Sequence, residues 1–338
     1  MDTWRQSDAC LTRQARVRDM NMANVSVFVL DLNRAEDTIG CVNRVLASDN
    51  VTITVYVLTN GSHASHRDKI DRCFAGDKRV LLHHSAVNLG FTGGMNYLYR
   101  QVISQSEIPD YVLLLNNDAF VFPGTVIAMQ QVLDRNPHFG IACPTVVSVT
   151  DNDMIMESGL HISLWLMQQR PLHAGKRLMN LTATAVRSMP VANGTCMLIR
   201  TSLYTRLGGL DDRYFAYFED WDLCLRAGDT GSMTVLVPTA IVSHRGSATT
   251  GHKSGLFCYL MTRNRYCLAY RHLPFPVFIA VFLPYFMCSR VVFKLLQLML
   301  ERNREGIQGV FMALGWILAP PVYRDRFVMQ SIQHIDII

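Results

Sequence analysis

The sequence is poor in charge and lacks the signals of secreted, zinc-binding or disordered chains. Only 17% of its 338 residues are charged, whereas 49% are hydrophobic, and this apolar share excludes intrinsic disorder. The nine cysteines are odd in number and scattered, and no CxxC pair occurs. This pattern argues against a disulfide framework or zinc knuckle and favours a reducing cytoplasm. The N-terminus also lacks the apolar core of a secretory signal.

Two phosphate-binding signatures are missing after the first predicted strand. The segment that begins at Asp31 contains no GxGxxG, so a dinucleotide-binding fold is not indicated. It also lacks the Gly-Arg-rich loop that a sugar nucleotidyltransferase would use, which disfavours that class. No internal repeat is apparent, so a solenoid is not supported.

The basic surplus is confined to the last quarter of the chain. Residues 253–338 carry ten Lys/Arg and four Asp/Glu, a surplus of six, so the overall charge of +5 leaves residues 1–252 at minus one. The same quarter is the most apolar, and the mean hydropathy of the chain is +0.14. This combination favours an anionic lipid surface, and not nucleic acid, as the partner.

The first half alternates strands and helices. This order predicts βαβ units and an α/β, Rossmann-like, mainly parallel sheet flanked by helices, with ligands beyond the carboxyl ends of the strands. After residue 139 the alternation loosens, although a helix is expected at 219–228. The strands are expected at 25–30, 51–58, 79–84, 111–115, 140–149, 189–200 and 232–243, and the earlier helices at 35–48, 64–75 and 95–106.

The C-terminal region differs in pattern. Residues 273–289 are uncharged but contain three prolines. From Arg290 onward, polar residues recur every three to four positions as far as Gln308, which predicts one amphipathic helix at the bilayer interface. A core helix packed under the domain is the alternative, and a single spanning helix is disfavoured by length and by Pro284. We therefore expect a flexible leader at 1–23, a folded domain at 24–252 and a helical, membrane-associating region at 253–338.

Asn116-Asn117-Asp118 follows a buried strand and is the strongest candidate site. A buried carboxylate needs a cation or hydrogen-bond donors, and Mg²⁺ or Mn²⁺ that also takes diphosphate oxygens needs only one or two protein carboxylates. Asn116 and Asn117 could bind sugar hydroxyls or water ligands. The alternative is an Asx turn that caps the helix starting at Pro123.

Glu219-Asp220-Trp221-Asp222 begins the predicted helix at 219–228. Helix capping is one interpretation, because acidic residues are favoured in a first turn. Asp222 and Arg226, four residues apart, are expected to form a salt bridge, which leaves Asp220 as the candidate base.

Three further features are weaker alone. The glycine-rich turn at 88–96 suits either phosphate or sugar contact or close helix packing. His244 ends a strand and could be a metal ligand, although a structural role is commoner. Arg263 and Arg265 could meet phosphate or be solvated.

Taken in order, these segments resemble the inverting nucleotide-sugar glycosyltransferases of family 2, with the GT-A fold, and most closely their bacterial rhamnosyltransferase-like members. The resemblance covers about 240 residues. The matching segments are 25–33, 59–62, 88–96, 113–124, 192–200, 207–226, 242–251 and 263–265.

The resemblance implies a role for each matching position. Asp220 becomes the catalytic base, Asp118 and His244 the metal site for Mg²⁺ or Mn²⁺, and Asp211, Glu219 and Trp221 the acceptor side. The implied donor-binding residues are Leu32, Asn33, Thr59, Asn88, Gly93, Gly94, Asn96, Asn116, Asn117, Gly194 and Arg263.

The sequence departs from the family at the base-binding positions. Thr59 replaces the usual Asp that helps to bind the nucleotide base, Leu32 stands where an aromatic often stacks, and Asp31 where Asn is common. The nucleotide is therefore open between UDP and dTDP.

The expected function is transfer of rhamnose or another hexose, with inversion, from a nucleoside-diphosphate sugar to a polyprenyl-diphosphate-linked glycan. The setting would be O-antigen or capsule synthesis by a peripheral protein at the cytoplasmic face of the inner membrane. The alternatives are a non-catalytic nucleotide- or glycan-binding relative and a sugar nucleotidyltransferase.

Overall fold

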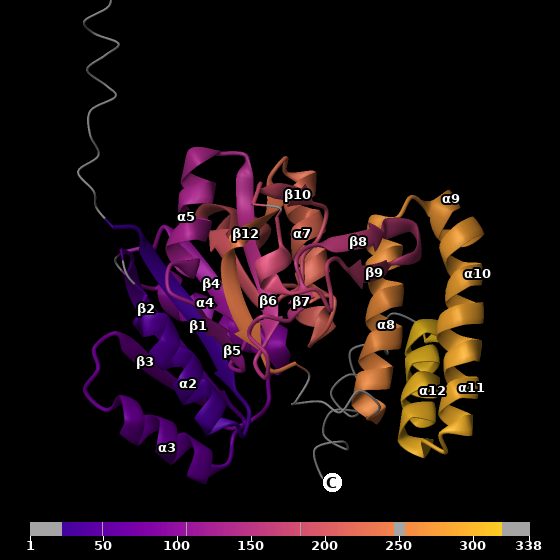
Figure 1. Ribbon diagram of the computed structural model, residues 1–338. Coiled ribbons are helices and arrows are strands. Elements are labelled where there is room, and N and C mark those ends of the chain that lie inside the picture. The colour runs from indigo at the N-terminus through magenta and orange to yellow at the C-terminus, as the bar shows by residue number, and fades with distance from the viewer. Residues whose placement is uncertain (1–21, 49, 106, 183, 247–253, 320–338) are drawn as a thin grey trace, which may run out of the picture.

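The computed structural model describes residues 22–319 except 49, 106, 183 and 247–253. The predicted leader therefore lies almost wholly outside the described residues, as does the end of the C-terminal region. Within the described part, a central sheet with helices on both faces is followed by a group of C-terminal helices (Figure 1).

The central sheet has ten strands, and eight of them follow the spatial order β10-β12-β6-β11-β4-β1-β2-β3. β5 pairs with β12, and β7 pairs with β6. β8 and β9 form a separate two-stranded sheet. The bounds are β1 Asn24–Asp31, β2 Thr52–Asn60, β3 Val80–Ser85, β4 Tyr111–Leu115, β5 Ala119–Val121, β6 Phe139–Ser148, β7 Ile155–Glu157, β8 Leu160–Ser163, β9 Gln168–Pro171, β10 Arg187–Met189, β11 Cys196–Arg200 and β12 Met233–His244.

The predicted α/β sheet flanked by helices is confirmed; its βαβ part is parallel, and the remainder is mixed. β1 to β4 are parallel to their neighbours in the βαβ part, and β12 is parallel to β6. β11 lies antiparallel between β4 and β6, and it is reached after the long excursion that contains β7 to β10. The predicted strand at 189–200 is two separate strands, β10 and β11.

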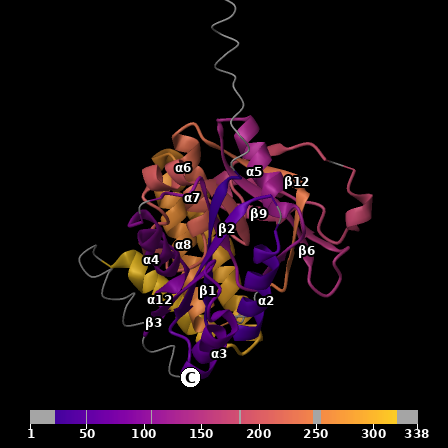
Figure 2. The same cartoon turned by 90° about the vertical axis from the view of Figure 1, so that its left-hand side faces the viewer.

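Two helix layers cover the sheet (Figure 2). Apolar residues of α2, α3 and α5 share one core cluster with the sheet, and those of α4, α6 and α7 share the other. The bounds are α2 Ala35–Leu46, α3 Ala64–Phe74, α4 Gly90–Ile103, α5 Thr125–Arg135, α6 Thr201–Leu207 and α7 Glu219–Asp229. Helix α4 begins inside the expected glycine turn, five residues before the predicted start at 95.

The C-terminal helices stand beside the sheet domain and share its core. Helix α8 (Gly255–His272) contributes Cys258 and Leu268 to the cluster that contains Trp221. A continuous helix, Phe275–Leu300, follows and includes α9 Phe275–Val277, α10 Leu283–Tyr285 and α11 Phe293–Leu300. The chain then turns back as α12 (Arg304–Leu318), which packs against α8 (Figure 1).

The structure corrects two expectations for this region. Pro284 does not end the helix, because π-helical turns at Phe278–Phe282 and Phe286–Val292 flank it and accommodate the missing backbone donor. The polar pattern from Arg290 to Gln308 does not lie on one helix, because the chain leaves the helix after Leu300 and Arg302 adopts a φ of 56°.

One side of the helix Phe275–Leu300 packs into the core through buried residues such as Phe282, Phe286 and Leu298, and its outer side exposes further apolar residues. The helix has 26 residues and a mean hydropathy of 1.8, long and apolar enough to cross a membrane, and only 22% of its most apolar window is buried. Arg290, Lys294 and Gln297 are partly buried, whereas Phe293 is 67% exposed and Leu300 87% exposed. A helix enclosed in the core would not leave an apolar side exposed in this way.

Candidate active site

Asp118 and His244 meet at the end of the sheet, although 126 positions separate them in the chain. β5 pairs antiparallel with β12, which aligns Ala119 with His244 and brings Asp118 Oδ1 to 3.1 Å from His244 Nε2. Burial raises the pKa of Asp118, but the hydrogen bond and charge of His244 outweigh burial, so the pKa lies below its ordinary value. Asp118 is therefore ionised at neutral pH.

The Asx-cap alternative for this triplet is wrong. β5 separates Asp118 from α5, and the helix takes Gly124 as its N-cap without a side-chain hydrogen bond. Asn117 Nδ2 instead donates to Thr38 Oγ1 on α2 at 3.0 Å, and Asn116 is partly exposed.

Asp118 and His244 fit a divalent cation that completes its shell elsewhere. Two ligands that share Mg²⁺ or Mn²⁺ at about 2.1 Å in octahedral geometry lie roughly 3 Å apart, which is the spacing of these two atoms. The described residues hold no group of three or more His, Cys, Asp or Glu side chains that could bind a metal alone. Such a site would need diphosphate oxygens and water as its remaining ligands.

Asp220 lies in the first turn of α7 and is partly exposed. Its Oδ2 accepts a hydrogen bond from Gly194 N at 2.8 Å, and its Oδ1 accepts one from Trp221 N at 2.8 Å. Burial raises the pKa of Asp220 to about 6, although these backbone donors oppose the shift. A fixed carboxylate with this pKa can accept a proton at neutral pH.

The segment 193–195 links the two acidic positions. Gly194 contacts Asp220, and Thr195 O accepts a hydrogen bond at 3.0 Å from the backbone N of Asn116, two residues before Asp118. A side chain at 194 would meet Asp220 Cβ at 3.2 Å, so glycine permits this close approach. The structure thus brings together the predicted positions 116–118, 194 and 220.

Two further carboxyl groups lie beside Asp220. Glu219 is 6% exposed and its Oε2 has no hydrogen-bond partner, and burial raises its pKa well above the ordinary value. Glu157, on β7, accepts a hydrogen bond from Asn193 Nδ2, and burial raises its pKa to about 8. Glu157 escapes prediction from the sequence because its three-residue strand gives no periodic signal.

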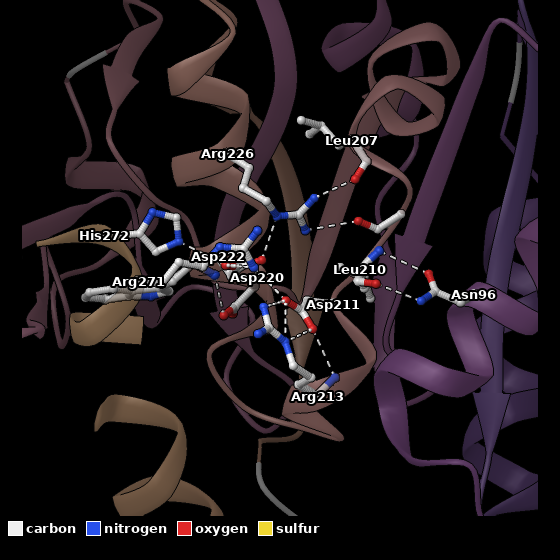
Figure 3. Close-up of polar contacts among 12 residues, drawn as sticks. Asn96, Leu207, Leu210, Asp211, Arg213, Asp220, Asp222, Arg226, Arg271 and His272 are labelled. Atoms are coloured by element: carbon white, nitrogen blue, oxygen red, sulfur yellow. Dashed lines mark hydrogen bonds and ion pairs between the residues drawn. The ribbon is translucent and has the colours of Figure 1, made fainter. Parts of the chain in front are cut away.

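Asp222 fixes α7 through a buried ion-pair network (Figure 3). The predicted bond to Arg226 is present at 2.7 Å, and His272 Nε2 and Arg271, at the end of α8, lie 2.9 and 3.1 Å from Asp222 Oδ1. Burial raises the pKa of Asp222, but these three cationic or donor groups outweigh burial and lower it. Asp222 is therefore a structural anchor between α7 and α8.

Two of the residues expected on the acceptor side, Asp211 and Trp221, contact other residues of the fold. Asp211 pairs with Arg213 at 2.6 Å and with Arg271 at 2.5 Å, and these partners outweigh burial and lower its pKa to about 2. Trp221 is 3% exposed and packs edge-on against Phe218.

The loop before α7 is held in an unusual backbone conformation. Phe215, Tyr217 and Phe218 all have φ between 64° and 69°, a region that non-glycine residues rarely adopt. Asn264 Nδ2 donates to the carbonyls of residues 214, 216 and 217, at 2.7–2.9 Å. Arg263, 1% exposed, donates to the carbonyls of residues 213 and 214.

Arg263 is therefore a brace for the loop that precedes Asp220. Its buried guanidinium donates hydrogen bonds to backbone carbonyls of the same chain. These contacts argue against the expectation that Arg263 binds the sugar-nucleotide donor. The sequence pattern points to residue 263 but not to Asn264, whose contacts lie about 50 positions away.

The glycine-rich turn at 88–96 and Asn96 also make contacts within the fold. A Cβ at Gly94 would meet Leu30 at 2.8 Å, and Gly93 lies in the first turns of the helix. Asn88 Oδ1 accepts from Gly90 N at 2.9 Å. Asn96 is buried and bonds both backbone groups of Leu210 (Figure 3). Of the two alternatives for this turn, these contacts favour close packing.

The positions expected to bind the nucleotide base lie together at the ends of β1 and β2. Asn33 adopts a φ of 56° and accepts from His63 N at 2.7 Å, and Leu32 is partly exposed. Thr59 is 2% exposed and its Oγ1 lies 2.8 Å from His84 Nδ1.

Solved glycosyltransferase structures share this architecture, which has the GT-A fold. The chain aligns with a mannosyltransferase from Pyrobaculum calidifontis in complex with GDP-Man and Mn²⁺, at a TM-score of 0.52, 16% identity and coverage of 91% of this chain and 84% of that one. It also aligns with residues 1–349 of TarS from S. aureus in complex with UDP, at a TM-score of 0.53, 14% identity and coverage of 93% and 88%. At these identities the likeness establishes the fold.

The chain belongs to the family described as glycosyltransferase like family 2, whose model matches residues 23–267. It is 29% identical, over 51% of its length and 61% of the relative's, to the N-acetylglucosaminyl-diphospho-decaprenol L-rhamnosyltransferase of Mycobacterium tuberculosis. It is 20% identical, over 63% and 64%, to the low-salt glycan biosynthesis hexosyltransferase Agl10 of Haloferax volcanii. The matches span less than two thirds of either relative.

Proposed function

We propose that this protein is an inverting glycosyltransferase that moves a hexose, such as rhamnose, from a nucleoside-diphosphate sugar to a hydroxyl of a lipid-linked glycan. The observation that carries the proposal is the segment 193–195, which contacts Asp220 on one side and the Asn116–Asp118 turn on the other. A base and a diphosphate site joined in this way suit attack on one anomeric carbon.

Asp220 is the catalytic base in this mechanism. It accepts the proton of the acceptor hydroxyl as the oxygen forms a bond to the anomeric carbon, while the bond from that carbon to the diphosphate breaks. Attack from the face opposite the leaving group inverts the configuration. Gly194 N and Trp221 N hold the carboxylate in place for this step.

Asp118 and His244 are the residues that would hold Mg²⁺ or Mn²⁺. When bound, the cation supplies positive charge that stabilises the departing nucleoside diphosphate. Asn116 and Asn117 flank this position, and Leu32, Asn33 and Thr59 lie where the base and ribose of dTDP or UDP would bind. The mannosyltransferase with the same fold is in complex with GDP-Man and Mn²⁺, which supports a cation and a sugar nucleotide here.

The acceptor is proposed to be a glycan on a polyprenyl diphosphate, as the name of the mycobacterial relative suggests. The apolar outer side of Phe275–Leu300 would place the active site at a membrane surface, peripheral on the cytoplasmic side. Synthesis of a surface polysaccharide such as O-antigen or capsule is the process that fits.

A panel of UDP-, dTDP- and GDP-sugars, with and without EDTA, tests the proposal on the full-length protein. We expect one donor to support transfer to a lipid-diphosphate sugar, loss of turnover with EDTA, and an inverted anomeric centre by NMR. A non-catalytic relative would turn over no donor. A nucleotidyltransferase would instead release pyrophosphate from a nucleoside triphosphate and a sugar phosphate.

A further inference from the structure

Two arginines on different C-terminal helices converge on one short segment of the sheet domain. Arg265, on α8, donates from Nη1 to the backbone oxygen of Met167 at 3.0 Å. Arg290, on the helix Phe275–Leu300, donates from Nε to the hydroxyl oxygen of Tyr285 at 2.8 Å. Gln168 donates to the same hydroxyl oxygen, so Arg265 contacts residue 167 directly and Arg290 is linked to residue 168 through Tyr285.

This arginine pair has no carboxylate partner among the described residues. The contacts of Arg265 and Arg290 are a carbonyl, a hydroxyl and the rings of Phe218 and Tyr285, at 5.1 and 5.6 Å from the guanidinium carbons. By contrast, Arg226 and Arg271 are paired with Asp222, and Arg263 donates to two backbone carbonyls. Two partly buried like charges repel each other unless an anion lies between or beside them.

The pKa of Arg265 agrees with a pair of like charges that lacks an anionic partner. Burial, together with the nearby charge of Arg290, lowers the pKa of Arg265 to about 9. The group stays protonated at neutral pH, and a bound anion would offset both the lost hydration and the repulsion.

The position of the pair is as informative as its charge. Arg265 lies over the ring of Phe218, the N-cap of the helix that begins with Glu219 and Asp220. Arg290 lies on the helix whose outer side is apolar. From the base outward, the order is therefore carboxylate, arginine pair and lipid-facing surface. A lipid-linked acceptor has the matching order of hydroxyl, sugar, diphosphate and lipid.

We propose that Arg265 and Arg290 bind the diphosphate that joins the acceptor sugar to its lipid. The inference rests on the proposed function and adds the group by which the acceptor is recognised. Arginine suits this ligand because its planar group donates two parallel hydrogen bonds to phosphate oxygens. The donor diphosphate is assigned elsewhere, at Asp118 and His244.

The test compares two acceptors with the same sugar, farnesyl-diphosphoryl N-acetylglucosamine and octyl N-acetylglucosaminide. Arg290→Gln is expected to raise the KM for the diphosphate acceptor at least tenfold. The KM for the sugar nucleotide and the rate with the octyl glycoside should both stay unchanged. Arg290→Lys should restore part of the loss, and Arg265→Gln should repeat it. Lys294→Gln, which removes the same charge one turn along the helix, is the matched control.

Three results would overturn the inference. An equal loss on both acceptors would show a structural effect, a raised KM for the sugar nucleotide would place the pair in the donor site, and an equal loss in Lys294→Gln would indicate attraction to anionic lipid headgroups. If wild-type protein transfers sugar to neither acceptor, the proposed function fails instead. Binding of farnesyl diphosphate in EDTA, measured by calorimetry against farnesol, still tests the pair: Arg290→Gln should weaken it at least tenfold, and unchanged binding would refute the site.

Discussion

At the scale of the residue, the surroundings of Asp220 set the orientation and the pKa of its carboxyl group. Two backbone donors fix the carboxylate and favour its charge, whereas burial disfavours its charge. The outcome is an aspartate with a pKa of about 6, poised closer to neutrality than an aspartate in water.

This pKa predicts the pH dependence of transfer. The base acts only when unprotonated, so kcat/KM should fall about tenfold per pH unit below about pH 6 and be level above it. A pH–rate profile on the wild-type protein, with stability checked at each pH, measures this. A profile that stays flat down to pH 4.5 would contradict the assignment.

Some features of the candidate site can be predicted from the sequence, and others cannot. The places of Asp118 after a strand and of Asp220 in a first helical turn, and the Asp222–Arg226 bond, follow from strand ends and helical spacing, because these depend on neighbours in the chain. The roles of Asn96 and Arg263 do not, because a polar side chain gives no sign of whether it faces a ligand or a distant carbonyl.

At the scale of the element, α8 supports the loop that precedes the base. Its buried Asn264 uses both amide hydrogens on three carbonyls of a loop in which Phe215, Tyr217 and Phe218 have positive φ. Such a conformation persists only where surrounding contacts enforce it.

Asn264→Ala is therefore expected to lower the free energy of unfolding by about 2–4 kcal/mol, since it leaves buried carbonyls without donors. It should also reduce kcat, because Asp220 follows directly on this loop. Chemical denaturation and initial rates measure the two effects. Asn43→Ala, at an exposed position of α2, is the control and should change stability by less than about 0.5 kcal/mol. Equal stability of the two variants would contradict the brace.

Helices and strands can be predicted from the sequence where a local pattern of apolar residues defines them. The first four strands and their helices lie within a few residues of their predicted bounds, because alternating apolar runs mark them. The antiparallel insertion of β11 and the reversal after Leu300 do not follow from the sequence, since both depend on how distant segments pack.

At the scale of the whole molecule, the C-terminal helices form part of the sheet domain's core and turn an apolar side outward. Arg271 and His272 join the end of α8 to Asp222 on α7 (Figure 3). These ion pairs and the shared core thus connect the surface expected to meet a membrane to the proposed active site.

Removing outward apolar groups should release the protein from membranes. Phe293→Ser with Leu296→Ser is expected to weaken binding to vesicles of phosphatidylethanolamine and phosphatidylglycerol at least tenfold, since each buried side chain contributes about 1.5–3 kcal/mol. Co-sedimentation in high salt measures this. Val87→Ser with Ile108→Ser, exposed apolar residues on the sheet domain, should bind like wild type. Full release of wild-type protein by salt alone would refute apolar contact.

The most direct test of the account is sugar transfer by Asp220→Asn, measured beside Asp229→Asn, which removes the same charge from the exposed far end of the same helix. The account predicts that Asp220→Asn loses about 10²–10⁴-fold in kcat while it still binds the sugar nucleotide, and that Asp229→Asn keeps wild-type activity. Turnover by Asp220→Asn within a few-fold of wild type would contradict the assignment of the base.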